Sequence, residues 1–298
     1  GINGSGKHTN WSMGTDTGKN LLSPGSAPKD NLQFLTFFIN TIKAVHDNAD
    51  LLRAVIASAA NDHRLGANEA PPAIISVFIG SQLTKVLDEI EKPSRKKKKD
   101  LPSSYVKLGI PKIPELVRDN TDRNRTSPFA FTGNKFEFRA VGSSANSSGA
   151  MTVLNAIVAK QLTEFKKTID RKTTRGKKKE VAILEVLRDY VKASKAIRFE
   201  GNGYSDEWVE EAEKRGLNNI KKTPRALDVY VAEETIDLFE QLDIFSGKEL
   251  HARHEIRLEQ YVNKVGIEAR VLSDMARTQV LPAAIAYQKQ IADTIESM

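Results

Sequence analysis

Apolar residues recur at helical spacing along most of the chain and at strand spacing in only a few short stretches. Steps of three and four residues place apolar side chains on one face of a helix. In the first 200 residues this pattern predicts helices at 31–44, 49–60, 81–91, 151–169 and 180–197. We expect Asp30 or Asn31 to cap the first helix and Asp47 the second, because their side-chain oxygens can accept free amides at a helix start.

Two segments have the pattern of strands instead. Residues 73–79 are continuously apolar and β-branched, which is typical of a buried strand. Residues 135–141 begin with alternating charges and phenylalanines, which predicts a strand with Lys135, Glu137 and Arg139 on one face. Without further context, such charges would indicate only a solvent-exposed strand face.

From about residue 206 the pattern is almost entirely helical. Apolar faces predict helices at 206–215, 224–242, 247–265 and 267–297, the last with a kink at Pro282, which has no backbone N–H. No internal repeat is present. We interpret this part of the chain as a helical packing or oligomer-forming region.

The first twelve residues combine a glycine-rich loop with a polar strand. The loop at 1–6 contains three glycines and an asparagine, so its backbone can approach a ligand closely. In an extended strand, His8, Asn10 and Ser12 lie on one face. An imidazole, an amide and a hydroxyl in this order suit a metal–nucleotide site.

Residues 1–7 (GINGSGK) also fit the G-x-x-x-x-G-K pattern of a phosphate-binding P-loop. His8 stands where that motif needs Ser or Thr to hold Mg²⁺, and the following residues lack a helical pattern. A P-loop NTPase is therefore the disfavoured alternative, and a helix beginning directly after Lys7 would restore it.

Three motifs in order resemble the glutamine synthetase family. Residues 3–12 (NGSGKHTNWS) resemble N-G-x-G-x-H-x-H-x-S, with Asn10 in place of the second histidine. Residues 64–71 (RLGANEAP) are similar to R-L-x-P-G-x-E-A-P, one residue shorter. Residues 123–125 (RNR) and 135–139 (KFEFR) resemble R-N-R and R-x-E-x-R. The amino-acid sequences of these segments and the length of the C-terminal part resemble the bacterial type III form of the family.

The resemblance implies a fold class and a division of the chain. It implies α+β, with a catalytic-type domain built on a curved, mainly antiparallel sheet with helices, followed by an α-helical C-terminal region. We expect residues 1–200 to be the C-terminal part of the catalytic domain and residues 201–298 a helical extension. Because the chain begins without Met and inside a motif, we expect it to be the C-terminal portion of a longer protein, and inactive alone.

The resemblance also implies metal and substrate sites. Glu137 matches a ligand of one divalent ion and His8 a ligand of a second, with Mg²⁺ or Mn²⁺ suited to these donors. Asn3, Gly4, Arg64 and Arg139 would bind the substrate glutamate. Glu69 would close over the site and help to deprotonate ammonium. Taken alone, Arg64 and Glu69 would indicate an ion pair in a surface turn.

The nucleotide site follows from the same resemblance. Arg125 would bind ATP phosphates and stabilise the transferring phosphoryl group, a role that suits a planar, permanently charged guanidinium. Asn10, Ser12 and Lys135 would also contact the nucleotide, Lys135 in place of an arginine. Ala130 stands where the family usually has an arginine. The implied reaction is ATP-dependent ligation of ammonia to glutamate, in a homo-oligomeric ring.

Composition narrows the partners and the compartment. The chain has 298 residues, no cysteine and a formal net charge of +7, and it contains no membrane-length apolar run and no secretory signal. We therefore expect a cytoplasmic protein that does not bind a membrane. We also expect no nucleic-acid binding, because the clusters of basic residues have no interleaved aromatics. The clusters at 92–99 and 166–179 are expected to be solvated loops. His251, His254 and Glu255 are expected to be surface residues.

A second alternative is a non-catalytic helical assembly protein that keeps a relic of the catalytic domain. In that case His8, Glu69, Glu137 and Arg139 would not converge in space.

Overall fold

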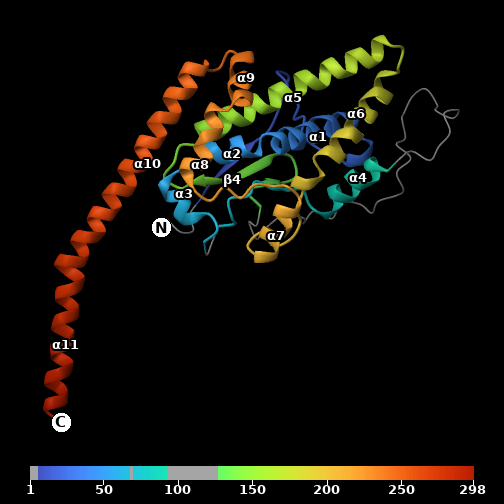
Figure 1. Cartoon of the computed structure of the whole chain (residues 1–298). Coiled ribbons are helices and arrows are strands. Elements are labelled where there is room, and N and C mark those ends of the chain that lie inside the picture. The colour runs from blue at the N-terminus through green and yellow to red at the C-terminus, as the bar shows by residue number, and fades with distance from the viewer. Residues whose placement is uncertain (1–5, 68–69, 93–126) are drawn as a thin grey trace.

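The computed structural model describes residues 6–67, 70–92 and 127–298. Within this part of the chain, helices surround a small sheet, and one long helix extends away from them (Figure 1). Asn3, Gly4, Glu69 and Arg125 lie outside the described residues, as does most of the basic run at 92–99.

The sheet has four strands in the order β1-β4-β3-β2. These are β1 (Gly6–Trp11), β2 (Val77–Phe78), β3 (Phe129–Phe131) and β4 (Phe136–Gly142). β4 pairs antiparallel with β1 and β3, whereas β2 pairs parallel with β3. The described residues are therefore mostly helical around a small mixed sheet, in agreement with the expected α+β class at this coarse level.

Phenylalanines on one face of the sheet form the centre of the core. Phe129, Phe136 and Phe138 are fully buried, and the rings of Phe129 and Phe136 stack 4.8 Å apart. Phe38, from the helix α1 (Leu32–Asp47), stacks on Phe136 at 5.7 Å. Because side chains alternate along a strand, this packing directs the intervening residues of β4 to the other face.

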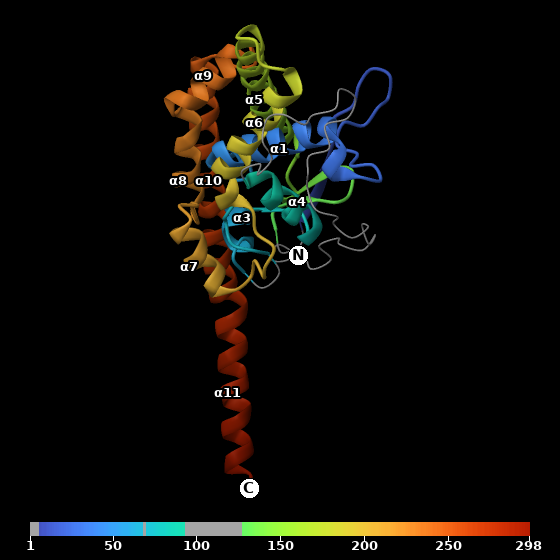
Figure 2. The same ribbon diagram turned by 90° about the vertical axis from the view of Figure 1, so that its right-hand side faces the viewer.

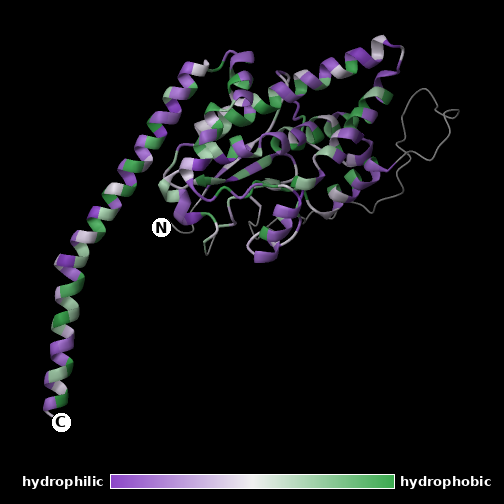
Figure 3. Cartoon of the chain, viewed as in Figure 1, coloured by the Kyte–Doolittle hydropathy of each residue, from purple (hydrophilic) through white to green (hydrophobic). Residues whose placement is uncertain are grey.

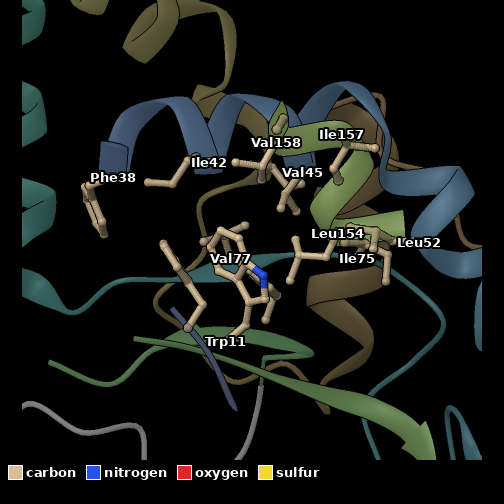
Figure 4. Packing of buried hydrophobic residues seen from close by; sticks show 14 of the residues in the cluster. Trp11, Phe38, Ile42, Val45, Leu52, Ile75, Val77, Leu154, Ile157 and Val158 are labelled. Carbon is tan, nitrogen blue, oxygen red and sulfur yellow. The ribbon is translucent and has the colours of Figure 1, made fainter. Parts of the chain in front are cut away.

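Helices α1, α2 (Ala49–Val55), α5 (Ser148–Thr174) and α6 (Lys179–Ala193) pack together beside the sheet (Figures 1 and 2). Figure 4 shows Trp11 of β1 and Val77 of β2 pointing toward Leu154 and Ile157 of α5. The Trp11 indole Nε1 donates to Asn155 Oδ1 at 2.8 Å. Strands and helices thus share one core.

The remaining helices are α3 (Ala59–Arg64), α4 (Ser81–Glu91), α7 (Asp206–Lys214), α8 (Thr223–Leu227), α9 (Glu233–Gln241), α10 (Gly247–Met275) and α11 (Leu281–Glu296). Short 3₁₀ turns lie at Pro28–Asp30, Lys195–Ile197 and Asp228–Val231, and a π-helical segment at Ala276–Val280. Leu227, Phe239 and Leu250 belong to the same buried cluster as the sheet. The expected division at residue 200 stays a prediction.

Several expected elements are confirmed. The helices predicted at 81–91 and 206–215 are α4 and α7, and Asn31 caps α1 by accepting from the Phe34 amide. The strand expected at 135–141 is β4. Among the described residues, no helix is both long enough and apolar enough to cross a membrane.

Other expectations were wrong. The helix expected at 49–60 is divided into α2 and α3, because the Ser58 side chain caps a new helix at Ala59. Asp47 is the last residue of α1 and caps nothing. The strand expected at 73–79 is paired in the sheet only at Val77–Phe78, although most of the segment is buried.

The C-terminal half also differs from expectation. The helix expected at 224–242 is broken by the 3₁₀ turn at Asp228–Val231, and α10 passes through Gly266 without a break. A glycine inside a helix costs only about 1 kcal/mol, so it need not end one. The π-helical segment ends at Val280, two residues before Pro282, where a kink was expected. The basic run at 166–179 lies largely in α5, with a turn only at 175–178.

Candidate active site

Glu137 is the centre of a polar cluster on the face of the sheet opposite the phenylalanines. His8 Nδ1 lies 3.0 Å from Glu137 Oε1, and Arg139 Nε donates to Glu137 Oε2 at 2.8 Å. The strands explain this convergence: β1 and β4 are antiparallel neighbours, and an irregularity in register between Lys7 and Thr9 re-aims His8. The polar face expected from the sequence therefore joins two neighbouring residues of β4 to His8, which lies 129 positions before Glu137.

The positive charge of Arg139 compensates the negative charge of the Glu137 carboxylate. Burial tends to raise the pKa of the Glu137 carboxyl, but the hydrogen bond and charge of Arg139, together with His8, outweigh it and hold the pKa below its usual value. The carboxylate is thus kept ionised, and both of its oxygens are oriented by side chains of the two strands. An ionised carboxylate beside an imidazole is a suitable pair of ligands for a divalent cation.

Arg64, the last residue of α3, lies behind this cluster. It is buried, its Nη1 donates to Asn61 Oδ1 at 3.1 Å and to the Ala140 carbonyl at 3.2 Å, and its Nη2 donates to the Arg139 carbonyl at 3.1 Å. Its Nε is buried without a hydrogen-bond partner among the described residues. The guanidinium therefore attaches α3 to the backbone of β4.

Gly6 leaves the space that Arg64 occupies. A Cβ atom added to Gly6 would lie 2.1 Å from Arg64 Nη2 and 3.0 Å from the Arg139 carbonyl oxygen. No side chain fits at this position unless the guanidinium moves. The last glycine of the N-terminal loop is thus explained by contact with a protein side chain, in addition to any ligand.

Two residues near the cluster were missed by the sequence analysis. Asn61 is fully buried, and its Nδ2 donates to the carbonyls of Ile56 and Ala140 while its Oδ1 accepts from Arg64. Tyr204, on the loop before α7, acts electrostatically on Arg64. No motif indicated either residue, because their roles depend on contacts across the fold.

The expected nucleotide-binding residues are arranged along the same strands. Asn10 is exposed and lies directly opposite Glu137 in the register of β1 and β4, so the two share a face. Ser12 Oγ donates to Asn20 Oδ1 at 2.9 Å and to the Asn134 carbonyl at 3.2 Å. Lys135 directly precedes β4 and is half-buried.

Ala130 also belongs to this row of residues. It pairs with Glu137 across β3 and β4, so an arginine here would place its side chain on the face that carries the polar cluster. The replacement of the family's usual arginine by Ala130 thus lies within the candidate active site.

Both alternatives can be compared with this geometry. A strand, β1, and not a helix, follows the glycine-rich loop, which contradicts the P-loop interpretation. Three of the four residues expected to stay apart in a relic domain, His8, Glu137 and Arg139, instead meet; the fourth, Glu69, is outside the described residues.

The histidines of α10 form no second metal site in the part of the chain described here. His251 is exposed, and its Nδ1 lies 2.8 Å from the Gly247 carbonyl. His254 Nε2 lies 3.5 Å from Asp228. Within the described ranges, no group of three or more His, Cys, Asp or Glu side chains is arranged to hold a metal ion, so His8 and Glu137 would need further ligands.

Comparison with known proteins identifies relatives along the entire chain. Residues 182–298 match a family model described as the glutamine synthetase C-terminal domain. The chain is 52% identical over 99% of its length to a glutamine synthetase from Bacteroides fragilis (strain YCH46) and 46% identical over 100% of its length to the type-3 glutamine synthetase of Dictyostelium discoideum. A glutamine synthetase from Butyrivibrio fibrisolvens is 43% identical. The chain spans about two fifths of the length of these relatives, 41%, 40% and 41% respectively.

Proposed function

The chain belongs to the glutamine synthetase family, and from this premise we propose that it forms part of an ATP-dependent enzyme that ligates ammonia to glutamate. The observation that carries the proposal is the convergence of His8, Glu137 and Arg139 on one face of the sheet. The comparisons establish kinship, and this cluster supplies chemistry that the reaction needs.

We propose that His8 and Glu137 hold the same Mg²⁺ or Mn²⁺ ion, in place of the two ions expected from the sequence. His8 Nδ1 and Glu137 Oε1 lie 3.0 Å apart, so both side chains would be within reach of one ion. The bound ion would neutralise phosphate charge during phosphoryl transfer.

The other residues of the cluster would orient the substrates. The Arg139 guanidinium is fixed at Nε by Glu137, so it is preorganised to receive a substrate carboxylate. Most of the Arg64 donors are bonded to β4 carbonyls and Asn61, which favours a role in supporting the site more than in clamping glutamate directly. Asn10, Ser12 and Lys135 lie along the strands where the nucleotide would bind.

The reaction has two steps. The glutamate γ-carboxylate oxygen attacks the γ-phosphorus of ATP, which breaks the bond to ADP and gives an acyl phosphate. Ammonia then attacks the acyl carbon and releases phosphate. Glu69 would take the proton that ammonium must lose, with Arg125 stabilising the transferring phosphoryl group. Asn3 and Gly4 would contact glutamate, in an active site assembled within a homo-oligomeric ring.

Metal binding is the direct test. In the longer protein, Glu137→Ala should weaken Mn²⁺ binding, measured by titration calorimetry, and raise the metal concentration needed for half-maximal activity, while circular dichroism stays unchanged. Glu185→Ala removes a carboxylate that is paired with Lys177 at the surface and serves as the matched control. Equal Mn²⁺ affinity in both variants would refute the assignment of Glu137.

Kinetics can separate a proton-transfer residue from a substrate-binding residue. Glu69→Ala should lower kcat by about 10²–10⁴ with little effect on ATP binding, since general acid–base catalysis contributes on that scale. Arg139→Ala should mainly raise the KM for glutamate. Wild-type turnover in Glu69→Ala would show that the 64–71 loop has no catalytic role.

A further inference from the structure

One asparagine joins three separate segments at the end of the polar face of the sheet. Asn20 closes a short hairpin, in which it pairs antiparallel with Gly14. Its Oδ1 accepts from Ser12 Oγ at 2.9 Å and from the Leu22 amide at 2.8 Å, and its Nδ2 donates to the Asn134 carbonyl at 2.8 Å. The side chain therefore links the residue after β1, the segment after the hairpin and the turn between β3 and β4.

The neighbours of the Asn20 side chain determine its orientation. The Leu22 amide can only donate a hydrogen bond and the Asn134 carbonyl can only accept one, so Oδ1 and Nδ2 cannot exchange places. An aspartate here would lack the donor, and an alanine would lack both the donor and the acceptor. The contacts thus require the carboxamide group.

These contacts lie where the pairing of β1 with β4 ends. The register of the two strands ends with Trp11 opposite Phe136, so the next facing positions are Ser12 and Lys135. Because side chains alternate along a strand, both of these positions fall on the face opposite the phenylalanines. Figure 3 shows this alternation as hydrophilic and hydrophobic residues that follow one another along β4. Asn20 holds the first member of this pair directly and the turn that precedes the second.

We propose that Asn20 is a positioning residue for the nucleotide: it holds the Ser12 hydroxyl and the turn before Lys135 in the arrangement that receives ATP. The inference rests on the proposed function, in which Ser12 and Lys135 contact the nucleotide. Asn20 touches no substrate in this scheme and acts through the two residues. It lies outside the motifs that indicated the site.

The same bonds determine how Ser12 meets a ligand. Its hydroxyl carries a single hydrogen, which is directed to Asn20 Oδ1 at 2.9 Å and to the Asn134 carbonyl at 3.2 Å. The lone pairs of the oxygen therefore remain for a ligand group that donates a hydrogen bond. Without the Asn20 side chain the hydroxyl would rotate more freely, so its contact with a ligand should weaken although Ser12 itself is unchanged.

The fold itself depends little on these hydrogen bonds. Ser12 and Asn134 are exposed, so water can replace Asn20 as their partner when its side chain is removed. Residues 14–19 of the hairpin are exposed as well. Water cannot replace the fixed orientation of the hydroxyl and the turn, and a ligand site depends on that orientation.

Steady-state kinetics of the longer protein test the inference. Asn20→Ala should raise the KM for ATP by about two- to tenfold, which is the usual contribution of a neutral hydrogen bond expressed as an affinity. The KM for glutamate should stay unchanged, because Asn20 does not touch the proposed glutamate contacts. Titration calorimetry with a non-hydrolysable ATP analogue and Mg²⁺ should show the same loss of affinity directly.

Thr15→Ala is the matched control in the same hairpin. It removes the hydrogen bonds of Thr15 Oγ1 with Thr17 Oγ1 and the Lys19 amide, and it leaves those of Asn20 in place. Its KM for ATP should equal that of the wild type.

A double-mutant cycle tests whether Asn20 acts through Ser12. Ser12→Ala and Asn20→Ala should together raise the KM for ATP by much less than the product of their separate effects, because both changes act on the same hydroxyl. Circular dichroism should show that the single and double variants keep the fold.

Four results would overturn the inference. An Asn20→Ala variant that binds the ATP analogue like the wild type would show that the amide does not position the nucleotide. Equal effects of Asn20→Ala and Thr15→Ala would assign the effect to the hairpin as a whole. Multiplicative effects in the cycle would show that Asn20 does not act through Ser12. Loss of the fold, or equal rises in the KM values for ATP and glutamate, would show a merely structural role.

The wild type separates this inference from the proposed function. A wild-type protein that bound no ATP would refute the proposed function and the inference with it. A wild type that binds ATP, with an Asn20→Ala variant of equal affinity, would refute the inference alone.

Discussion

Asp62 connects the C-terminal helices to the rest of the fold, and its replacement should be strongly destabilising. Its carboxylate accepts from the Thr223 backbone amide at 3.0 Å, from Thr223 Oγ1 at 2.7 Å and from the Tyr261 hydroxyl at 3.2 Å. Arg53 Nη2 lies 3.7 Å away, and the exposed side-chain fractions of Arg53 and Asp62 are 2% and 5%. Four groups therefore depend on one buried carboxylate.

The expected magnitude follows from what Asp62→Ala leaves behind. Removing one partner of a buried ion pair costs about 3–5 kcal/mol, because the other charge stays buried without compensation. The remaining backbone bonds of Arg53, to the Ile220 and Lys221 carbonyls, moderate this cost, so we expect about 3–4 kcal/mol. This is a large part of the 5–15 kcal/mol that typically stabilises a domain.

Three further variants make the test specific. Tyr261→Phe removes one hydrogen bond to Asp62 and should cost about 1 kcal/mol. Asp170→Ala breaks the exposed ion pair with Lys166 and should cost under about 1 kcal/mol. The double replacement Arg53→Met/Asp62→Leu should cost much less than the sum of its single replacements, because it leaves no unpaired charge.

Urea unfolding followed by circular dichroism gives the free energies of unfolding. Hydrogen exchange should show lost protection around residues 220–227 in Asp62→Ala, where the backbone of Thr223 loses its acceptor. The reasoning would be refuted if Asp62→Ala cost no more than Asp170→Ala, since burial would then have no influence on the ion pair.

Two smaller predictions concern a glycine and a titrating group. Gly6→Ala should displace the Arg64 guanidinium and lower both stability and activity, whereas Gly14→Ala, whose nearest contact would be 3.6 Å away, should be nearly neutral in the same assays; equal effects would contradict the close approach. Burial tends to raise the pKa of Asp47, but bonds to His46 and Lys43 hold it below its usual value, so the folded state binds fewer protons than the unfolded state. The stability difference between wild type and Asp47→Asn should therefore be present above about pH 4, the ordinary carboxyl range, and disappear as the pH falls through the folded pKa; a difference independent of pH would contradict this.

The elements that sequence analysis identified well are those with local start and stop signals. α7 begins after Ser205, whose side chain accepts from the Trp208 amide, and its apolar face is regular. The break between α8 and α9 was missed because the apolar spacing continues in phase through residues 228–231. β3 was missed because three apolar residues become a strand only when β2 and β4 lie beside them.

The candidate site was also predictable only in part, where a local pattern in the sequence indicates it. Glu137 and Arg139 alternate with phenylalanines, so the alternation predicted a polar face of β4, and only the resemblance to glutamine synthetases indicated a site there. The environment of Arg64 could not be predicted. Its acceptors on β4 are 75 and 76 residues away, and no local pattern indicates which carbonyls a guanidinium will meet. An arginine at the end of a helix can bind many different acceptors, and only the tertiary fold determines which of them it meets.

The six residues of α3 explain why the helical C-terminal region matters to the candidate site. One part of this helix, Asp62, is held by Thr223 and Tyr261 from the C-terminal region. Another part, Asn61 and Arg64, is bonded to the backbone of β4, where Glu137 and Arg139 begin the polar cluster. So short a helix cannot keep its place by its own hydrogen bonds, because isolated helices of this length are unstable in water. The position of α3 therefore depends both on the C-terminal region and on β4. A substitution that breaks the contact of Asp62 with Thr223 and Tyr261 should shift α3, and through Asn61 and Arg64 it should shift the backbone of β4, which carries Glu137 and Arg139.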